Sequence, residues 1–378
     1  MQRLRVGVVG VGHLGRHHAR VLAGIEGVEL VAVADSRLAQ AEAVAGPLGA
    51  LAFEDYRELI GRVDAVSVAA PTSLHREIAG AFLERGVSAM VEKPLTSRSD
   101  QAAELVELAW SNNAILQVGH IERFNPALSA LDDLRVRPRY ISAERSGTYT
   151  FRSTDIGVVF DLMIHDIDLI LAMVSAPVRS VSAIGVSLFG PLEDVAQARV
   201  EFADGTVADL TASRASMQAT RKMRIWGSEG YVALDFAAKT GTRVRPSDLL
   251  RHGTLDVEGL DMTQPAAVKE RLFGKILRVD QVQGEGREPL ALELEDFVQA
   301  VRTGSTPRVS GADALRSVKL AEQIVQSLQA HEWDGTAGGP TGPRDLPTST
   351  VEPIAGLLGP ISWRSRVGRG AAVGEARD

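Results

Sequence analysis

Three polar residues lie at helical spacing in an otherwise apolar segment near the middle of the chain. Asp161, His165 and Asp168 are four and three residues apart, which places all three on one face of a helix. Polar groups on one stripe of an apolar helix are costly to bury unless they bind one another or a ligand. The set could therefore transfer a proton, hold a metal ion or form an ordinary ion pair. Since the chain has no His-Glu-x-x-His pair and no cysteine, we expect no metal here.

A glycine-rich turn near the N-terminus has the pattern of a dinucleotide-binding site. Gly10, Gly12 and Gly15 follow a short apolar run and open a helical one. In this pattern the first glycine permits a tight turn, the second lets the backbone approach a pyrophosphate, and the third allows close packing of helix on strand. The start of the helix then offers free N–H groups to the phosphates. His17 and His18 follow on this helix and are expected to have no chemical role.

An acidic residue follows the turn at the spacing that this pattern requires. Asp35 ends the next apolar run, twenty residues after Gly15, where a carboxylate can hydrogen-bond the hydroxyls of an adenosine ribose. A carboxylate there would also repel the 2′-phosphate of NADP, so the sequence favours NAD. Arg37 could pair with that phosphate, which keeps NADP as the alternative.

A lysine follows another buried run of the first half. Glu92, Lys93 and Pro94 come directly after the apolar run Ser88–Val91. Ligands of a parallel sheet lie outside the carboxyl ends of its strands, so Lys93 would point into the cofactor crevice. Pro94 cannot continue a strand ladder and restricts Lys93 to extended backbone. The alternative is a surface lysine beside a turn proline.

The composition fits a globular protein of a reducing compartment, and we expect it in the cytoplasm. Of its 378 residues 45% are hydrophobic and 24% charged, which allows a substantial core and excludes disorder of the whole chain. The net charge is −7 and basic runs are absent, so nucleic acid is not an expected partner. No apolar run reaches the ~18–20 residues of a membrane helix, so we expect no membrane partner. The lack of cysteine excludes disulfides and thiolate sites.

Short, nearly all-apolar runs alternate with longer amphipathic ones over the first 120 residues. All-apolar runs are typical of strands buried on both faces, and their alternation with helices predicts a parallel, doubly wound sheet. The predicted strands are Arg5–Val9, Val28–Ala34, Ala65–Ala70, Ser88–Val91 and Ile115–Val118. The predicted helices are Gly12–Leu22, Arg37–Ala45, Leu74–Arg85 and Ser99–Asn112. The fold class is therefore α/β, with a Rossmann domain over residues 1–120.

The pattern changes after His120. Five runs alternate with period two and are separated by turn signals, which predicts a second α/β domain over residues 121–334 with a largely antiparallel open sheet. These runs are Arg139–Ser146, Val181–Ser187, Ala196–Phe202, Val207–Arg214 and Lys222–Trp226. Helices are predicted at Val158–Val174, Leu292–Arg302 and Ala312–Gln329. In residues 335–378 glycine, proline, serine and threonine dominate, which predicts a disordered tail.

Taken together, these residues resemble the Gfo/Idh/MocA family of oxidoreductases, which includes glucose–fructose oxidoreductase and inositol dehydrogenase. The resemblance covers about Arg5 to Gln329 and also draws on Ala70-Pro71-Thr72 with His75. One departure is Met163, where many relatives carry glycine. The resemblance implies that the cofactor binds to Gly10, Gly12, His13, Leu14, Gly15, Asp35, Ser36, Arg37, Ala70, Pro71, Thr72, His75, Glu92 and Lys93.

The same resemblance implies an NAD(P)-dependent oxidoreductase that acts on CH–OH groups. Lys93 would orient and polarise the substrate hydroxyl, His165 would accept its proton, and Asp161 would orient or share that proton. Neutral imidazole can accept a proton near neutral pH, because its reference pKa is ~6.5. The nicotinamide supplies the hydride acceptor. The family also implies a homodimer or homotetramer.

Two further segments are similar to the UDP-N-acetylglucosamine 3-dehydrogenases of lipid A biosynthesis within this family, namely residues 119–126 and 147–152. Those enzymes oxidise the 3-hydroxyl of the sugar to a ketone that an aminotransferase then uses. A nucleotide sugar carries a pyrophosphate, which requires a cationic pocket. The candidate substrate-binding residues are His120, Arg123, Asn125, Arg152 and Arg214. The alternatives are a free sugar or inositol as the substrate, and a nucleotide-binding sensor without turnover.

Overall fold

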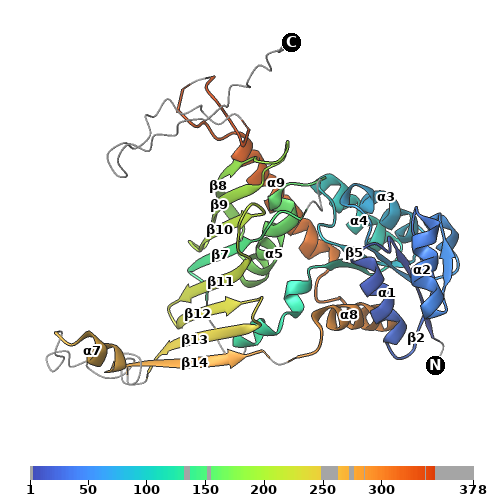
Figure 1. The fold of residues 1–378 in the computed structure, drawn as a ribbon, viewed down its shortest axis with the longest axis horizontal. Coiled ribbons are helices and arrows are strands. Elements are labelled where there is room, and N and C mark those ends of the chain that lie inside the picture. Colours follow the sequence, from blue (N-terminus) through green and yellow to red (C-terminus); the bar gives the residue numbers. More distant parts are fainter. Residues whose placement is uncertain are drawn as a thin grey trace, which may run out of the picture.

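The computed structural model describes residues 3–131, 137–150, 155–247, 263–271, 276–284, 286–336 and 338–344. Two β-sheets dominate this part of the chain, and helices lie between them (Figure 1). The first sheet comes from the N-terminal third of the chain, and the second from the residues that follow it.

The first sheet is parallel and has the strand order β3-β2-β1-β4-β5-β6. Its strands are β1 (Leu4–Val9), β2 (Val28–Ala34), β3 (Leu51–Phe53), β4 (Ala65–Val68), β5 (Ser88–Glu92) and β6 (Leu116–Gly119). The connecting helices are α1 (Gly15–Gly24), α2 (Leu38–Leu48), η1 (Tyr56–Leu59), α3 (Thr72–Leu83) and α4 (Ser99–Ser111). This confirms the predicted Rossmann sheet. The strand order reverses between β1 and β4, and at such a point the carboxyl ends of the strands border a ligand crevice.

Helices cover both faces of the first sheet, as its all-apolar strands require. α1 and α2 pack on one face, and α3 and α4 pack on the other. A further helix on the α1 face is α8 (Pro289–Thr303), which buries Leu294, Phe297 and Val298 in the same cluster as Val8 of β1 and Leu22 of α1. The sequence pattern places this helix in the domain 121–334. In the structure it packs on the first sheet (Figure 1).

The second sheet has eight strands in the order β14-β13-β12-β11-β7-β10-β9-β8, and all neighbours are antiparallel except β7 and β10. The strands are β7 (Tyr140–Ser146), β8 (Val178–Val186), β9 (Val195–Phe202), β10 (Val207–Ser213), β11 (Thr220–Gly227), β12 (Gly230–Asp235), β13 (Thr240–Pro246) and β14 (Leu277–Gln283). Short helices η2 (Ile121–Phe124), η3 (Pro126–Leu131) and α7 (Pro265–Arg271) complete this half. The largely antiparallel sheet is as predicted. The strands β12 to β14 are additional, and β13 and β14 lack a clean alternation because most of their residues are half-exposed or exposed.

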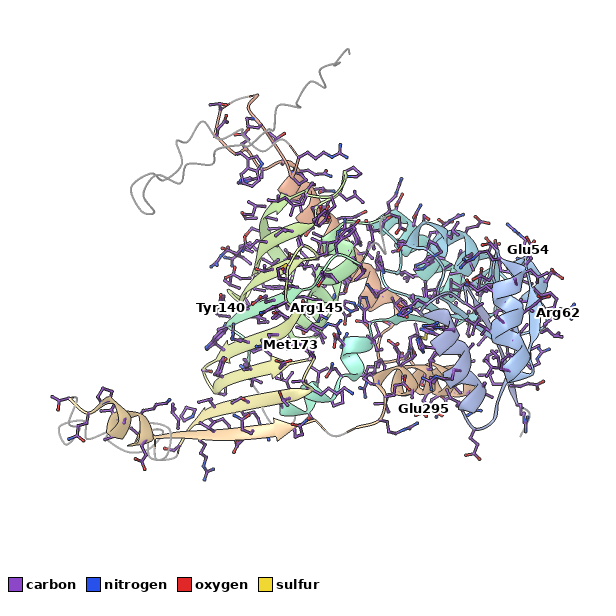
Figure 2. All side chains as sticks on the ribbon, viewed as in Figure 1. Glu54, Arg62, Tyr140, Arg145, Met173 and Glu295 are labelled. Carbon is purple, nitrogen blue, oxygen red and sulfur yellow. The ribbon has the colours of Figure 1, made fainter. Side chains whose placement is uncertain are left out.

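Helices lie on the side of the second sheet that faces the first. They are α5 (Ile164–Met173), which follows the π-helical turn η4 (Val159–Met163), and α9 (Gly311–Gln329). On β7, Ile141, Ala143 and Arg145 are buried on this side. Figure 2 shows Arg145 toward the end of β7 that is nearer the Rossmann domain and Tyr140 at the other end of this strand. The helix predicted at Val158–Val174 is therefore one π-turn followed by α5.

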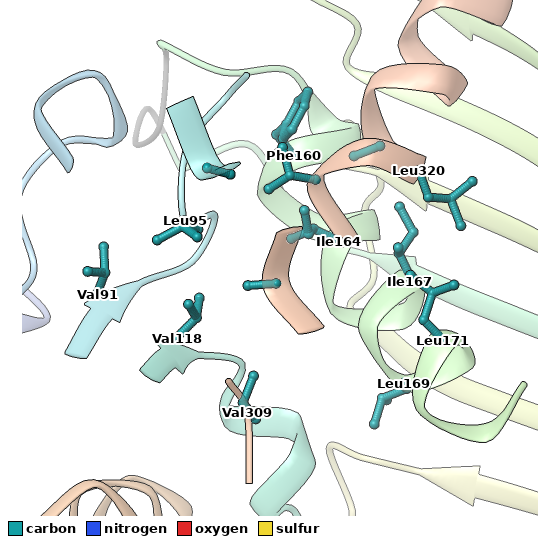
Figure 3. Close-up of a cluster of buried hydrophobic side chains, with 14 of the residues drawn as sticks. Val91, Leu95, Val118, Phe160, Ile164, Ile167, Leu169, Leu171, Val309 and Leu320 are labelled. Carbon is teal, nitrogen blue, oxygen red and sulfur yellow. The ribbon is translucent and has the colours of Figure 1, made fainter. Parts of the chain in front are cut away.

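One hydrophobic cluster joins the two halves of the molecule. Figure 3 shows Val91, Leu95 and Val118 of the first half on one side of this cluster, and Ile164 and Ile167 of α5 on the other. All five side chains are completely buried. This cluster therefore fixes α5 at the boundary between the two halves.

The chain after α9 folds back onto the second sheet. Glu332 forms a β-bridge with Thr341, Ser187 donates its N–H to the carbonyl of Pro343 (2.9 Å), and Arg344 Nε donates to the carbonyl of Pro191 (2.9 Å). The predicted tail thus makes contacts at its start, and residues 345–378 lie outside the described residues. In the described ranges no helix is long and apolar enough to cross a membrane.

Candidate active site

The glycine turn after β1 lies at the crevice between β1 and β4. Gly10 has a φ of 80°, and a Cβ on it would come within 2.8 Å of the carbonyl oxygen of Ala69. A Cβ on Gly15 would lie 1.8 Å from the carbonyl oxygen of Gly10, so the packing of helix on strand requires both glycines. A Cβ on Gly12 would meet only Gln40 Nε2, at 3.8 Å. The protein itself therefore leaves space at Gly12, which suits the close approach of a pyrophosphate.

Asp35 lies directly beside this turn. Its Oδ2 accepts hydrogen bonds from the N–H of Val11 (3.0 Å) and from Gln40 Nε2 (2.8 Å). Its Oδ1 accepts one from the N–H of Arg37 (3.0 Å). The side chains of Ser36 and Arg37 are exposed next to it. Asp35 thus holds the end of β2 against the glycine turn, at the place where a ribose would extend from the pyrophosphate.

Five more of the expected cofactor residues border the same crevice. His13 and Leu14 are exposed directly before α1, and Ala70, Pro71 and Thr72 follow β4, the parallel neighbour of β1. These loops lie at the carboxyl ends of two adjacent strands. A dinucleotide whose phosphates bind at the start of α1 would therefore contact both loops.

His75 departs from its expected role in binding the cofactor. Its ring is 1% exposed, with Nδ1 2.9 Å from the carbonyl oxygen of Pro94 and Nε2 2.8 Å from that of Ala70. Because both nitrogens face main-chain carbonyls, neither is available to a cofactor. His75 instead connects the turn after β4 to the turn that carries Lys93.

Glu92, also expected to bind the cofactor, binds protein groups instead. Its Oε1 lies 3.0 Å from Nε2 of His18, whose Nδ1 lies 2.9 Å from Ser67 Oγ. Its Oε2 accepts a hydrogen bond from the N–H of Lys93 (3.1 Å). Burial is the largest influence on Glu92 and opposes its ionisation, but the hydrogen bond and charge of His18 together with Lys93 hold the pKa of the carboxyl below its usual value. His18, for which we expect no chemical role, thus helps to fix the end of β5.

Lys93 reaches across the boundary between the two halves. Its Nζ donates to the main-chain oxygen of Asp161 (2.7 Å) and to Asp161 Oδ1 (3.1 Å). Asp161 lies in the π-helical turn before α5, and such turns are frequent at functional sites. Met163, in the same turn, is completely buried in the hydrophobic core. The predicted meeting of Lys93 with this helix therefore occurs, although Asp161 binds Lys93 and has no hydrogen bond to His165 in the described residues.

His165 lies near a second histidine at this boundary. The rings of His165 and His120 are perpendicular, with centroids 6.3 Å apart, and the Nδ1 atom of each is buried without a hydrogen-bond partner among the described residues. Burial, together with the charges of Lys93 and Arg145, holds the pKa of His165 well below its usual value. Burial also lowers the pKa of His120, although the carboxylate of Asp168 opposes this. Both imidazoles are therefore neutral at pH 7 and can accept a proton.

A buried ion network holds the residue next to His165. Arg145 Nε and one terminal nitrogen bind the two oxygens of Asp166 (3.0 and 2.9 Å), and the other terminal nitrogen binds Glu122 Oε1 (2.7 Å). Burial alone would lower the pKa of Arg145, but the two carboxylates raise it above its usual value. The network connects β7, α5 and η2, so it fixes the position of α5 relative to the segment that begins at His120.

The expected substrate cations turn out to be engaged with protein groups. Arg123 Nε donates to Asp168 Oδ2 (2.8 Å), and Arg214 donates to Asp194 (2.7 Å) and to the carbonyl of Ile156 (2.9 Å). Asn125 likewise has protein partners, since its Nδ2 donates to Glu122 Oε2 (2.8 Å) and to the carbonyl of Phe236 (3.0 Å). Arg152 lies outside the described residues. Arg123, Asn125 and Arg214 therefore act first as structural residues.

One cation that acts on His165 is not among the site residues predicted from the sequence. Arg221 is exposed at the start of β11, and its charge contributes to the low pKa of His165. The sequence does contain a signal for it, since Arg221, Met223 and Ile225 alternate with period two. That signal places Arg221 on the inner face of a strand, but it does not reveal which strand lies beside it.

The arrangement can take a proton and a hydride from one alcohol. An ammonium, a neutral imidazole and a dinucleotide crevice lie together, which are the parts required for alcohol oxidation. No group of three His, Asp or Glu side chains in the described part of the chain could hold a metal ion.

Comparison with known proteins agrees with this geometry. Residues 4–120 match "Oxidoreductase family, NAD-binding Rossmann fold", and residues 134–233 match "GFO/IDH/MocA C-terminal domain". The UDP-N-acetylglucosamine 3-dehydrogenase of Acidithiobacillus ferrooxidans is 35% identical, over 87% of this chain and 99% of the relative. The scyllo-inositol 2-dehydrogenase (NAD(+)) of Bacillus subtilis is 30% identical, over 86% of this chain and 94% of the relative.

Solved structures give the same result. A structure of the Acidithiobacillus ferrooxidans enzyme superposes with a TM-score of 0.75 at 34% identity, covering 87% of this chain and 98% of that one. Levoglucosan dehydrogenase in complex with NADH and L-sorbose has the same fold, with a TM-score of 0.72 at 20% identity. The match to the first enzyme extends through both sheets and over nearly its whole length. The chain therefore belongs to the Gfo/Idh/MocA family of oxidoreductases, with an NAD-binding Rossmann domain at its N-terminus.

Proposed function

We propose that this NAD-binding oxidoreductase oxidises the 3-hydroxyl of UDP-N-acetylglucosamine to a ketone. The proposal is carried by the meeting of Lys93, Asp161 and His165 beside the dinucleotide crevice. The Acidithiobacillus ferrooxidans relative, which is named for this reaction, supports the choice of substrate because this chain matches 99% of its length. The ketone would then be transaminated on the route to lipid A.

In this proposal His165 is the general base. It must accept the hydroxyl proton at neutral pH, and its low pKa keeps it neutral and ready to do so. The cations that lower this pKa also disfavour a lasting imidazolium, so the proton must leave His165 again after each turnover. His120, whose ring centroid lies 6.3 Å from that of His165, could receive it.

Lys93 orients the substrate oxygen. An ammonium has three donors, and Lys93 uses two of them on the carbonyl and carboxylate of Asp161. The third donor can hydrogen-bond the reacting oxygen and stabilise the negative charge that develops as its proton leaves. Asp161 is then a positioning residue for Lys93. Bound NAD supplies the hydride acceptor.

A free inositol is the second candidate substrate. It is favoured by the Bacillus subtilis relative, which is named for scyllo-inositol and is 30% identical to this chain. An inositol has no phosphate and needs no cation beyond Lys93. The two candidate substrates therefore differ in whether the substrate-binding side of the site needs an additional positive charge.

The test is to incubate the purified protein with NAD and a panel of substrates while following NADH absorbance. The panel contains UDP-N-acetylglucosamine, UDP-glucose, N-acetylglucosamine, scyllo-inositol and myo-inositol, and hydroxylamine is added to trap the ketone. We expect turnover with UDP-N-acetylglucosamine above all others, and strongly reduced turnover in the matched variant His165→Asn. Turnover with an inositol but with no UDP-sugar would overturn the proposal. Repeating the assay with NADP tests the preference for NAD that Asp35 indicates.

We also propose that the protein works as a homodimer or homotetramer, with the cytoplasm as the expected compartment. The outer face of the second sheet supports an oligomer because it carries a stacked row of aromatic rings. Trp226 stacks on Tyr140 and lies tilted against Tyr231, at centroid distances of 5.1 and 5.0 Å, and Tyr140 is 37% exposed. Light scattering of the purified protein would give a monomer mass if this proposal is wrong.

A further inference from the structure

Four cations that could bind a substrate are neutralised by the protein. Each has an acidic partner within 3.1 Å, and the pairs are Lys93 with Asp161, Arg123 with Asp168, Arg145 with Asp166, and Arg214 with Asp194. These pairs hold the site together and leave little charge for a substrate. An anionic substrate would therefore need a further cation.

Arg221 is such a cation. It pairs directly with Arg145 across β11 and β7, and it lies on the same face of the sheet as Met223 and Ile225, which are completely buried. Unlike those two residues, Arg221 is exposed, at the start of β11. Its guanidinium has no hydrogen bond or ion pair with any described residue.

The charge of Arg221 acts on the active site. It lowers the pKa of His165 and also acts on the neighbouring carboxyl of Asp166. Arg145 is already neutralised by Glu122 and Asp166, so Arg221 is not needed to balance charge within this network. Its charge therefore remains available to a bound anion.

We propose that Arg221 binds the phosphate next to the sugar of the substrate. This inference rests on the proposed function, since only a sugar phosphate or nucleotide sugar carries that group. The phosphate is attached to the anomeric carbon, which is separated from the carbon of the 3-hydroxyl by one ring carbon. A cation for it must therefore lie to one side of the Lys93 and His165 side chains that act on that hydroxyl.

The position and chemistry of Arg221 meet this requirement. It enters from β11 of the second sheet, whereas Lys93 enters from β5 of the first. A guanidinium can bind two phosphate oxygens at once, which a lysine cannot do in the same geometry. Arg221 thus selects phosphorylated substrates, while Lys93 and His165 act on the hydroxyl.

The experiment compares Arg221→Ala and Arg221→Gln with a matched control, Arg224→Ala. Arg224 lies on the same strand and is also exposed, but it is on the outer face of the sheet. Losing a hydrogen-bonded charge should raise the KM for UDP-N-acetylglucosamine and the inhibition constant of UDP by about 10- to 100-fold. The kcat should change much less than the KM, because the phosphate contact is the same in ground and transition states and Arg221 is the smallest of the influences on the pKa of His165. Arg224→Ala should behave as the wild type.

Two further measurements make the result unambiguous. NAD affinity, followed by quenching of tryptophan fluorescence, should be unchanged in both Arg221 variants and shows that they are folded. Affinity for N-acetylglucosamine, which has no phosphate, should also be unchanged. If the wild type oxidises UDP-N-acetylglucosamine but Arg221→Ala and Arg221→Gln keep its KM and the UDP inhibition constant, the inference is overturned while the proposed function stands. If the wild type oxidises only inositols and UDP does not inhibit it, the proposed function fails first.

Discussion

Replacing Arg145 by Met tests whether the buried ion network holds the site together. The side chains of Arg145, Glu122 and Asp166 are only 4%, 7% and 3% exposed. Met fills much of the volume of Arg145 but leaves two carboxylates buried without a cation. Removing one partner of a buried ion pair typically costs about 3–5 kcal/mol, and with two carboxylates stranded we expect the upper half of that range.

The assay is urea unfolding at neutral pH and fixed protein concentration, followed by circular dichroism. The matched control is Arg199→Met, which breaks an ion pair with Asp209 on the exposed side of the same sheet. Because Arg199 is 49% exposed, that change should cost less than about 1 kcal/mol. The triple variant Glu122→Gln, Arg145→Met, Asp166→Asn should recover most of the stability lost by Arg145→Met.

The pH dependence gives a second check on the same reasoning. Without Arg145, burial raises the pKa of Asp166 in the folded protein still further above its unfolded value. A group with a raised folded pKa contributes stability below its unfolded pKa and loses it as the pH rises through the folded pKa. The deficit of Arg145→Met should therefore shrink as the pH falls from neutral toward ~4. The reasoning would be refuted if Arg145→Met lost no more free energy of unfolding than Arg199→Met. It would also be refuted if the loss in Arg145→Met grew as the pH falls.

Three other predictions concern catalysis and the cofactor. Lys93→Met and His165→Asn should each lower kcat by about 10²-fold or more with unchanged NAD affinity, and near-normal kcat in both would remove these residues from the mechanism. Because burial and Lys93 hold the pKa of His165 well below its usual value, kcat/KM should stay level until the pH falls well below ~6.5; a decline that begins above neutral pH would contradict a neutral base. Gly12→Ala should weaken NAD binding and spare stability, whereas Gly15→Ala should lower the melting temperature because its Cβ collides with the Gly10 carbonyl; equal effects on both readouts would count against the assigned roles.

The sequence predicts the first half of the fold well because its signals are local. Strands such as β2, at Val28–Ala34, are continuous apolar runs, and the glycine turn belongs to a single strand–turn–helix unit. The same sequence does not predict β3, because three residues are too few for a periodic signal. It also does not predict the π-turn before α5, because its residues continue the helical pattern while the hydrogen bonding changes.

The sequence predicts those site residues that stand in recognisable motifs. It does not predict interactions in which the partner residue comes from a distant segment of the chain. Lys93 and His165 stand in recognisable motifs, and the structure brings them to one boundary. The roles of Arg123 and Arg214 depend on which acids reach them, and those acids lie 45 and 20 residues away in the chain. Arg221 remains unidentified for the same reason, since its meaning comes from Arg145 across a strand pair. The spacing of residues within one segment does not reveal which residues of another segment lie beside them.

The return of α8 to the first sheet has a consequence for how the protein is made. The strands and helices that α8 covers are complete by residue 120, but α8 begins at Pro289. During synthesis the apolar surface around Leu22 therefore stays uncovered while the whole second sheet emerges from the ribosome. Domains usually fold as units in order of synthesis, with the N-terminal one first. Here the nucleotide-binding half can finish folding only after its partner has been translated, so the two halves mature together and residues 1–120 alone would make a poor expression fragment.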